Sequence, residues 1–133
     1  MPRFSTALCA FLGLAGACPA QESFLEEFDR LDPAVWFVSD GWTNGAHQNC
    51  LWSRDAVRVE DGILTLEIAA TPGDETALRC GEVQSHRVQR HGTYEVRMRT
   101  AAASGVNAAF FTYIGPVHDQ PHDEIDEIGR AHV

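Results

Sequence analysis

Hydrophobic and polar residues alternate with a period of two along much of the chain. Residues 57–60 and 64–68 both follow this pattern, and Glu60-Asp61-Gly62 supplies a turn sequence between them. Successive side chains of a β-strand point to opposite faces, so the two segments predict a hairpin with one buried and one solvated face. The same alternation in residues 94–99 predicts an antiparallel strand with one face in solvent.

Other segments extend the β pattern toward both ends of the chain. Residues 24–29 indicate an edge segment that leads into a turn, residues 35–38 a short strand, and residues 80–85 another strand. Residues 106–114 are apolar on both faces, which predicts a central strand. No stretch has a sustained helical period, and no internal repeat is visible. We therefore predict an all-β fold, an antiparallel β-sandwich or jelly roll.

A pair of acidic side chains lies on the last predicted strand. In a strand over residues 121–127, Glu124 and Asp126 share one face while Asp123 and Ile125 point to the other. Like charges held close together destabilise a fold, so such a pair indicates a functional site. The alternative is a solvated edge without a function, and spacing alone does not decide between the two.

A glycine-flanked loop at residues 41–45 is a second candidate site. It contains Trp42 and Asn44, and an Asn-Gly step readily adopts positive φ. An aromatic ring and an amide in an irregular polar loop are suited to ligand recognition. The alternative is structural, with Trp42 packed over the core and Asn44 serving the turn.

Residues 1–20 have the features of a secretory signal peptide. Arg3 precedes an apolar run, and small residues are suited to cleavage before Gln21. The run is shorter than the about 20 residues of a membrane-spanning helix, so we expect no membrane insertion and a secreted or periplasmic protein. A second interpretation is a lipoprotein, because residues 15–18 partly resemble a cleavage box that would leave Cys18 lipidated.

Composition indicates one folded domain with an acidic surface. The chain has 133 residues, 44% of them hydrophobic and 22% charged, with three Trp, seven Phe and two Tyr. Its formal net charge is -9. Such a surface repels phosphate groups, which argues against nucleic acid and anionic membranes as partners and leaves neutral ligands open. We expect the protein to be a monomer.

Two cysteines lie beyond the signal segment, Cys50 and Cys80, whereas Cys9 and Cys18 lie within it. An even number of cysteines in an oxidising compartment predicts a disulfide, and two buried free thiols are the alternative.

Six short motifs occur in the order found in glycoside hydrolase family 16, which the chain resembles over roughly residues 24–126. The motifs are Gly41-Trp42-Thr43-Asn44-Gly45, Asn49-Cys50-Leu51-Trp52, Cys80-Gly81-Glu82, residues 91–98, residues 110–116 and Asp123-Glu124-Ile125-Asp126. The similarity is closest to bacterial lichenases, which are endo-β-1,3-1,4-glucanases, and to enzymes that trim bacterial exopolysaccharides such as succinoglycan. It implies a concanavalin-like jelly roll that hydrolyses a polysaccharide of this kind.

The resemblance implies a role for each matching residue. Glu124 would be the nucleophile of a retaining glycosidase, and Asp126 would orient and tune it. Cys50 and Cys80 match the lichenase disulfide. Sugar-binding positions of the family cleft are matched by Trp42, Asn44, Glu82, Tyr113 and His122. A Trp face stacks on a pyranose ring, and amides or carboxylates bind its hydroxyls. The family implies no required cofactor, with a structural calcium ion expected in the full-length protein.

Departures from the family pattern lie at three positions. Gln84 stands where lichenases usually have Arg, and His122 stands where they usually have Trp. The histidine is typical of the exopolysaccharide-trimming branch, which leaves the glucan open. The general acid/base of the family is the last Glu of Glu-Ile-Asp-x-Glu or, with a bulge, of Glu-Ile-Asp-x-x-Glu. The bulge-free pattern requires Glu at position 128, but the chain has Ile128 there, and Glu127 would point to the opposite face of a regular strand.

We interpret residues 21–127 as the N-terminal half of a glycoside hydrolase jelly roll and residues 128–133 as a non-native tail. The tail is the translation of ATC GGA AGA GCA CAC GTC, which resembles a widely used sequencing adapter. The general acid/base would then be missing from this chain, and we expect the fragment to be inactive alone.

Two other classes of site fit parts of the sequence. A non-catalytic glycan-binding β-sandwich module would explain Trp42, Asn44 and Glu82 without needing the acidic pair. A metal site of His118, His122 and Asp123 would need a turn, because the two histidines would stand about 13 Å apart along a strand. We expect no metal site.

Overall fold

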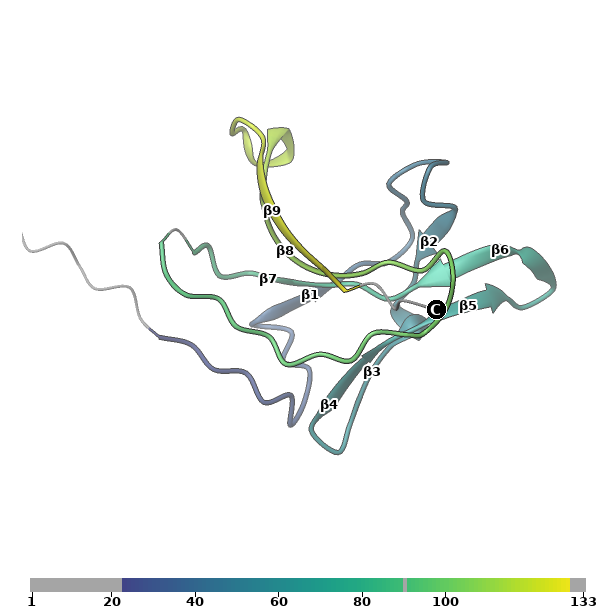
Figure 1. Ribbon diagram of the computed structural model, residues 1–133, viewed down its shortest axis with the longest axis horizontal. Coiled ribbons are helices and arrows are strands. Elements are labelled where there is room, and N and C mark those ends of the chain that lie inside the picture. Colours follow the sequence, from purple (N-terminus) through teal and green to yellow (C-terminus); the bar gives the residue numbers. More distant parts are fainter. Residues whose placement is uncertain (1–22, 90, 130–133) are drawn as a thin grey trace, which may run out of the picture. The chain divides into compact units, whose positions relative to one another are not determined.

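The computed structural model describes residues 23–89 and 91–129, and over these residues it consists of β-strands, two 3-10 turns and loops without an α-helix (Figure 1). The elements in chain order are β1 (Trp36–Val38), β2 (Cys50–Trp52), η1 (Arg54–Ala56), β3 (Val57–Glu60), β4 (Ile63–Leu66), β5 (Ile68–Thr71), β6 (Asp74–Cys80), β7 (Val83–Ser85), β8 (Ala108–Ile114), η2 (Pro116–His118) and β9 (Asp123–Gly129). The predicted all-β class is confirmed. The expected signal peptide at 1–20 and residues 130–133 of the expected tail lie outside the described residues.

The chain divides into two compact units, Met1–His91 and Gly92–Val133. The first unit contains β1 to β7 and the second contains β8 and β9. No helix in the described part of the chain has the length and apolar character needed to cross a bilayer.

Three small sheets form the first unit. β1 pairs antiparallel with β7, β3 pairs antiparallel with β4, and the third sheet has the order β2-β6-β5. In that sheet β5 and β6 are antiparallel, whereas β2 and β6 are parallel. The parallel pair departs from the expected antiparallel arrangement. It forms because the chain passes through β3, β4 and β5 before it returns beside β2, and parallel strands require such a crossover.

The hairpin predicted around residue 61 is confirmed as β3 and β4 (Figure 1). Asp61 and Gly62 both have positive φ, 51° and 71°, as a two-residue type I′ turn requires. The valines of β3 are half-buried and its charged residues are exposed, as the alternation predicts. The hairpin ends at Leu66 and does not include Ile68 as predicted. The Glu67 N–H donates to the Ala56 carbonyl instead, at 2.8 Å, and the chain then enters β5.

Residues 80–85 are two strands and not one as predicted. β6 ends at Cys80 and β7 begins at Val83, so the chain changes sheets at Gly81-Glu82. A Cβ on Gly81 would overlap the Ala56 carbonyl oxygen and would lie 3.1 Å from the Leu66 Cα. The close approach of these backbones therefore requires glycine at the point where the ladder breaks.

The predicted disulfide between Cys50 and Cys80 is present, with the two Cα atoms 6.0 Å apart. Cys50 begins β2 and Cys80 ends β6, so the bond joins the two strands of the parallel ladder. Apolar residues that are buried in the described part of the chain are Val38, Cys50, Ala56 and Cys80, and buried polar residues are Ser39 and Glu82. The core of the first unit thus lies around β1, η1 and the disulfide.

Residues 24–29 form no strand, but their aromatic side chains pack on β1. The Phe24 and Phe28 rings lie 6.3 and 5.5 Å from the Trp36 ring. Glu26 accepts hydrogen bonds from the Trp36 indole N–H at 2.9 Å and from the Phe28 N–H at 2.8 Å. Side-chain contacts therefore fix this segment in place of a strand ladder. In the turn that follows, the backbone N–H of Ala34 donates to the Asp32 carboxylate and holds the pKa of that carboxyl below its usual value.

The second unit is an antiparallel pair, β8 and β9, in register from Ala108 opposite Gly129 to Ile114 opposite Asp123. β8 has no further partner within the described residues, so the prediction of a central strand is wrong for this chain. The predicted strand at residues 94–99 is also absent. Its Tyr94, Val96 and Met98 side chains are 38 to 48% exposed. An alternating segment becomes a strand only when a neighbouring strand offers hydrogen-bond partners, and no described strand pairs with it.

Candidate active site

β9 places Glu124 and Asp126 on the same face, as predicted. Glu124 lies opposite Tyr113 and Asp126 lies opposite Phe111. Directly opposed residues of an antiparallel pair project to the same side, so this face carries two carboxylates and two aromatic rings. The Tyr113 and Phe111 residues are 41% and 38% exposed, whereas the β8 residues of the opposite face are half-buried. Along β8 the carboxylate face is thus the more exposed one, although β9 is exposed on both faces, and we call the face with Glu124 and Asp126 the open face.

His122 contacts Glu124 directly. The His122 Nε2 lies 3.0 Å from the Glu124 Oε2, and the side chains are 61% and 33% exposed. An ionised carboxylate has only acceptor atoms, so with Glu124 ionised the imidazole Nε2–H is the donor. The sequence indicated both residues as site candidates, and their spacing of two was the available signal for this contact.

Tyr113 connects this pair to the turn after β8. Its ring lies 5.6 Å from the His122 ring, edge to face, and 5.9 Å from the His118 ring. The turn is closed by the His118 N–H, which donates to the Gly115 carbonyl at 2.8 Å. A Cβ on Gly115 would overlap the Tyr113 hydroxyl, so glycine is needed for the tyrosine to lie where it does.

The alternative metal site does not form. The turn at η2 brings both His118 and His122 against Tyr113. However, no group of three or more His, Cys, Asp or Glu side chains over residues 23–89 and 91–129 is arranged to hold a metal ion. Asp123 lies opposite Ile114 and so on the other face of β9 from Glu124.

The open face of β9 has no third carboxylate. Ile128 follows Asp126 on this face, opposite Ala109, while Glu127 lies opposite Phe110 on the other face. The ladder is regular at these positions, so Glu127 points away from Glu124 as expected. The face alone can supply a nucleophile and a neighbouring acid, but not a carboxylic acid at the position that the family pattern requires.

Glu82 is held at the break between β6 and β7. It is buried, and its Oε2 accepts hydrogen bonds from the Ser39 hydroxyl and from the Gln84 amide, the latter at 2.9 Å. Neither bond uses Oε1. Sequence reasoning noted Gln84 only as a departure from the lichenase pattern and did not single out Ser39. The spacing of Glu82 and Gln84 was the available signal for the contact between them, because residues two apart in an extended chain share a face.

Trp42 packs against a neighbouring tryptophan and remains partly exposed. Its ring lies 6.0 Å from the Trp52 ring, yet 37% of the residue is exposed. The Trp52 N–H donates to the Trp42 carbonyl at 2.9 Å, which ties the loop to β2. Asn44 is exposed in the same loop, which is irregular as predicted.

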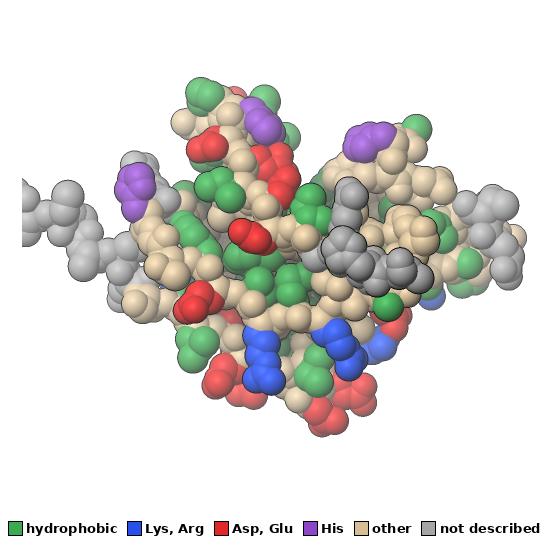
Figure 2. Space-filling model, in the orientation of Figure 1, with side chains coloured by type: hydrophobic (Ala, Val, Ile, Leu, Met, Phe, Trp, Pro, Cys, Tyr) green, Lys and Arg blue, Asp and Glu red, His purple; other side chains and the backbone are tan. Residues whose placement is uncertain are grey.

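The candidate residues come from both units. The first unit contains Trp42, Asn44 and Glu82, and the second contains Tyr113, His122, Glu124 and Asp126. Side-chain contacts hold Trp42 and Glu82 in the first unit and Tyr113, His122 and Glu124 in the second. Acidic side chains are spread over the face seen in Figure 2, with hydrophobic side chains exposed among them.

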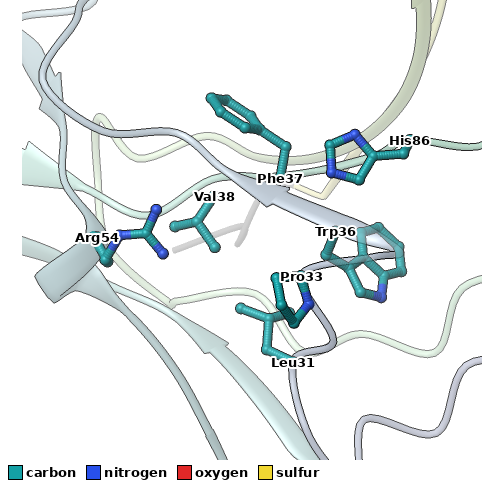
Figure 3. A pocket seen from close by; sticks show the side chains of 7 residues that line it. All are labelled: Leu31, Pro33, Trp36, Phe37, Val38, Arg54 and His86. Carbon is teal, nitrogen blue, oxygen red and sulfur yellow. The ribbon is translucent and has the colours of Figure 1, made fainter.

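A pocket of about 200 Å³ lies in the first unit and contains none of the candidate residues (Figure 3). It is lined by Leu31, Pro33, Trp36, Phe37, Val38, Arg54 and His86. Apolar side chains from the segment before β1 and from β1 itself form much of its wall. None of the sugar-binding positions expected from the sequence therefore lines this pocket.

Known proteins similar to this chain agree in the kind of enzyme that their names give. The endo-1,3-1,4-beta-glycanase ExoK of Rhizobium meliloti (strain 1021) is 53% identical over 105 residues, which cover 79% of this chain and 39% of that protein. A beta-glucanase of Bacillus amyloliquefaciens is 35% identical over 116 residues, which cover 86% of this chain and 48% of that protein. The chain therefore spans less than half the length of these relatives.

A solved structure agrees with the sequence relatives. The crystal structure of a prokaryotic beta-1,3-1,4-glucanase (lichenase) derived from a mouse hindgut metagenome matches with a TM-score of 0.72 and 39% identity, covering 77% of this chain and 49% of that one. This likeness confirms the predicted jelly-roll fold. The model of the Glycosyl hydrolases family 16 matches residues 44–128, which include β2 to β8 and the acidic pair of β9. The chain belongs to glycosyl hydrolase family 16.

Proposed function

We propose that the chain is the nucleophile-bearing part of a retaining endo-β-glucanase that hydrolyses β-1,3-1,4-type glucan or a related bacterial exopolysaccharide. The observation that carries this proposal is the open face of β9, where Glu124 and Asp126 stand side by side and His122 contacts Glu124. The family and the names of the relatives support this class of reaction. The name of the 53% identical relative, an endo-1,3-1,4-beta-glycanase, supports a glucan with these linkages, and the histidine at position 122 keeps a related exopolysaccharide open.

The reaction has two steps at the anomeric carbon. In the first, a Glu124 oxygen bonds to that carbon while its bond to the leaving sugar breaks, and the leaving oxygen takes a proton from a general acid. In the second, water attacks the same carbon, the ester bond to Glu124 breaks, and the water proton passes to the conjugate base of that acid. Two inversions give retention. Asp126, on the same face, would orient Glu124 for the attack.

The general acid/base is expected outside this chain's β9 face, because Ile128 occupies the family position. Large hydrophobic side chains are exposed in both units, among them Ile63 at 62% and Ile125 at 68%. An apolar surface of this kind requires cover from further protein. We therefore propose that the activity belongs to a longer protein and that the 133-residue chain is inactive alone.

The first unit supplies sugar-binding groups in this proposal. The exposed part of the Trp42 ring can stack on a pyranose, and Asn44 can bind hydroxyl groups. Glu82 has its Oε2 engaged by Ser39 and Gln84, which orients Oε1 for a ligand hydroxyl. The substrate is a neutral or weakly charged polysaccharide, and the protein acts as a monomer.

Export fits the same proposal. The Cys50–Cys80 disulfide is expected to persist only in an oxidising compartment. We propose a secreted or periplasmic protein with residues 1–20 as its signal peptide. Lipidation at Cys18 is the alternative that mass spectrometry of the mature N-terminus would detect.

A second candidate function is a non-catalytic glycan-binding module. The absence of a third carboxylate from the described face of β9 is the observation that favours it. It predicts that the intact reading frame has no Glu two or three residues after Asp126, whereas the hydrolase proposal predicts one.

The experiment compares the complete enzyme, translated from the source reading frame, with its Glu124→Gln variant. We expect the wild type to release reducing ends from barley β-glucan or succinoglycan, and the proton NMR spectrum to show the β-anomer of the product first. Loss of a nucleophile lowers kcat by at least about 10⁴-fold. Glycan binding without hydrolysis by the wild type would favour the binding module. Hydrolysis that survives in the variant would refute the role of Glu124.

A further inference from the structure

We propose that His122 is a positioning residue for Glu124 and not a sugar-binding residue. This inference rests on the proposed function, because it concerns the same nucleophile. Its basis is the short contact between the His122 Nε2 and the Glu124 Oε2, together with the packing that holds the imidazole in place.

The imidazole, although 61% exposed, contacts an aromatic ring as well as Glu124. Tyr113, directly across the ladder from Glu124, packs against the His122 ring edge to face. Tyr113 is itself located by Gly115, whose missing Cβ leaves room for the tyrosine hydroxyl. The hydrogen bond is therefore made by a donor with restricted freedom, which a mobile surface histidine would not provide.

The bond distinguishes the two oxygens of Glu124. Oε2 is engaged by His122, so Oε1 is the oxygen available to attack the anomeric carbon. After attack, Oε2 becomes the carbonyl oxygen of an ester, which is a weaker acceptor than a carboxylate oxygen. The bond from His122 therefore weakens in the first step and strengthens in the second, as negative charge returns to Glu124.

This change in strength predicts which step needs His122. Without the donor, the departing carboxylate is less stabilised and the second step slows, while the first step is slowed less or not at all. The covalent intermediate then accumulates, so kcat falls and KM falls with it. Loss of a sugar-binding residue has the opposite signature, since KM rises and the intermediate does not accumulate.

The test uses the complete enzyme with His122→Leu and His122→Gln. Leucine removes the donor, whereas the glutamine amide can place an N–H near the position of the imidazole Nε2. Substrates are barley β-glucan or succinoglycan, whichever the wild type hydrolyses, and the covalently glycosylated fraction is measured by intact mass spectrometry during turnover. We expect His122→Leu to lower kcat about tenfold, from the size of a partly exposed hydrogen bond to a charged group.

We also expect His122→Leu to lower KM and raise the glycosylated fraction, and His122→Gln to recover most of both changes. A raised KM with unchanged kcat would overturn the inference in favour of sugar binding. Equal losses in the two variants, without accumulation, would overturn it in favour of a packing role. Far-ultraviolet circular dichroism and the urea midpoint of each variant separate these outcomes from misfolding.

Glu124→Gln separates this inference from the proposed function. If that variant retains hydrolysis, the proposed function fails. If it is inactive while both His122 variants match the wild type, the proposed function stands and only the positioning role of His122 is refuted.

Discussion

Loss of the Cys50–Cys80 disulfide is expected to lower the free energy of unfolding by about 3.6 kcal/mol. The bond joins residues 30 apart in sequence. For a loop of that size the chain-entropy relation gives about 12 cal/mol/K, or about 3.6 kcal/mol at 25 °C. This is a large share of the about 5 to 15 kcal/mol by which a domain is stable. With a urea slope of about 2 kcal/mol/M, the midpoint should fall by about 1.8 M.

The assay is urea unfolding of the complete protein with and without dithiothreitol, followed by tryptophan fluorescence. Trp52 lies opposite Cys80 in the parallel ladder, so its emission reports on the region that the bond holds. The control is the double variant Cys50→Ser, Cys80→Ser, in which the reductant has no bond to break. A wild-type midpoint that dithiothreitol leaves unchanged would refute the reasoning, as would an equal shift in the double variant.

Two further substitutions test the packing of the first unit by the same unfolding assay. Gly81→Ala should lower the free energy of unfolding by about 1 to 3 kcal/mol, because its Cβ would overlap the Ala56 carbonyl oxygen. Its control is Gly92→Ala, which should change the free energy of unfolding by less than about 0.5 kcal/mol, because no atom lies within 4 Å of that Cβ. Glu26→Ala should lower it by about 1 kcal/mol by removing the acceptor of the Trp36 indole N–H, and Glu26→Gln, which keeps an acceptor oxygen, should lower it less. Equal effects within either pair would contradict the contacts described.

Local alternation predicted the elements whose partners are close in sequence. The β3–β4 hairpin follows from two alternating segments and a turn at Asp61-Gly62 that both residues can adopt. In this hairpin the information that decides the structure lies within ten residues, Val57 to Leu66.

Elements decided by distant contacts were not predictable in the same way. The break at Gly81 depends on the Ala56 backbone, 25 positions earlier, so alternation through residues 80–85 gave one strand where two exist. Residues 94–99 have the pattern of a strand but no described partner. The parallel pairing of β2 with β6 depends on a crossover that no local pattern encodes.

In the candidate site, too, some features follow from the local pattern and others depend on how the chain folds. The shared face of Glu124 and Asp126, and the opposite face of Glu127, follow from strand periodicity alone. The His122 contact with Glu124 and the packing of His118 on Tyr113 depend on how the turn after β8 folds back. A period of two puts residues 122 and 124 on one face but does not predict their hydrogen bond, and it cannot predict that η2 brings His118 against Tyr113.

The most direct test of the account is the site of covalent attachment in the complete enzyme. A 2,4-dinitrophenyl 2-deoxy-2-fluoro-β-glycoside of the disaccharide that the enzyme releases slows the second step and so traps the glycosyl-enzyme intermediate, which peptide mass spectrometry can locate. The account predicts a single label on Glu124. A label on another carboxylate, or hydrolysis with inversion and no label at all, would contradict it.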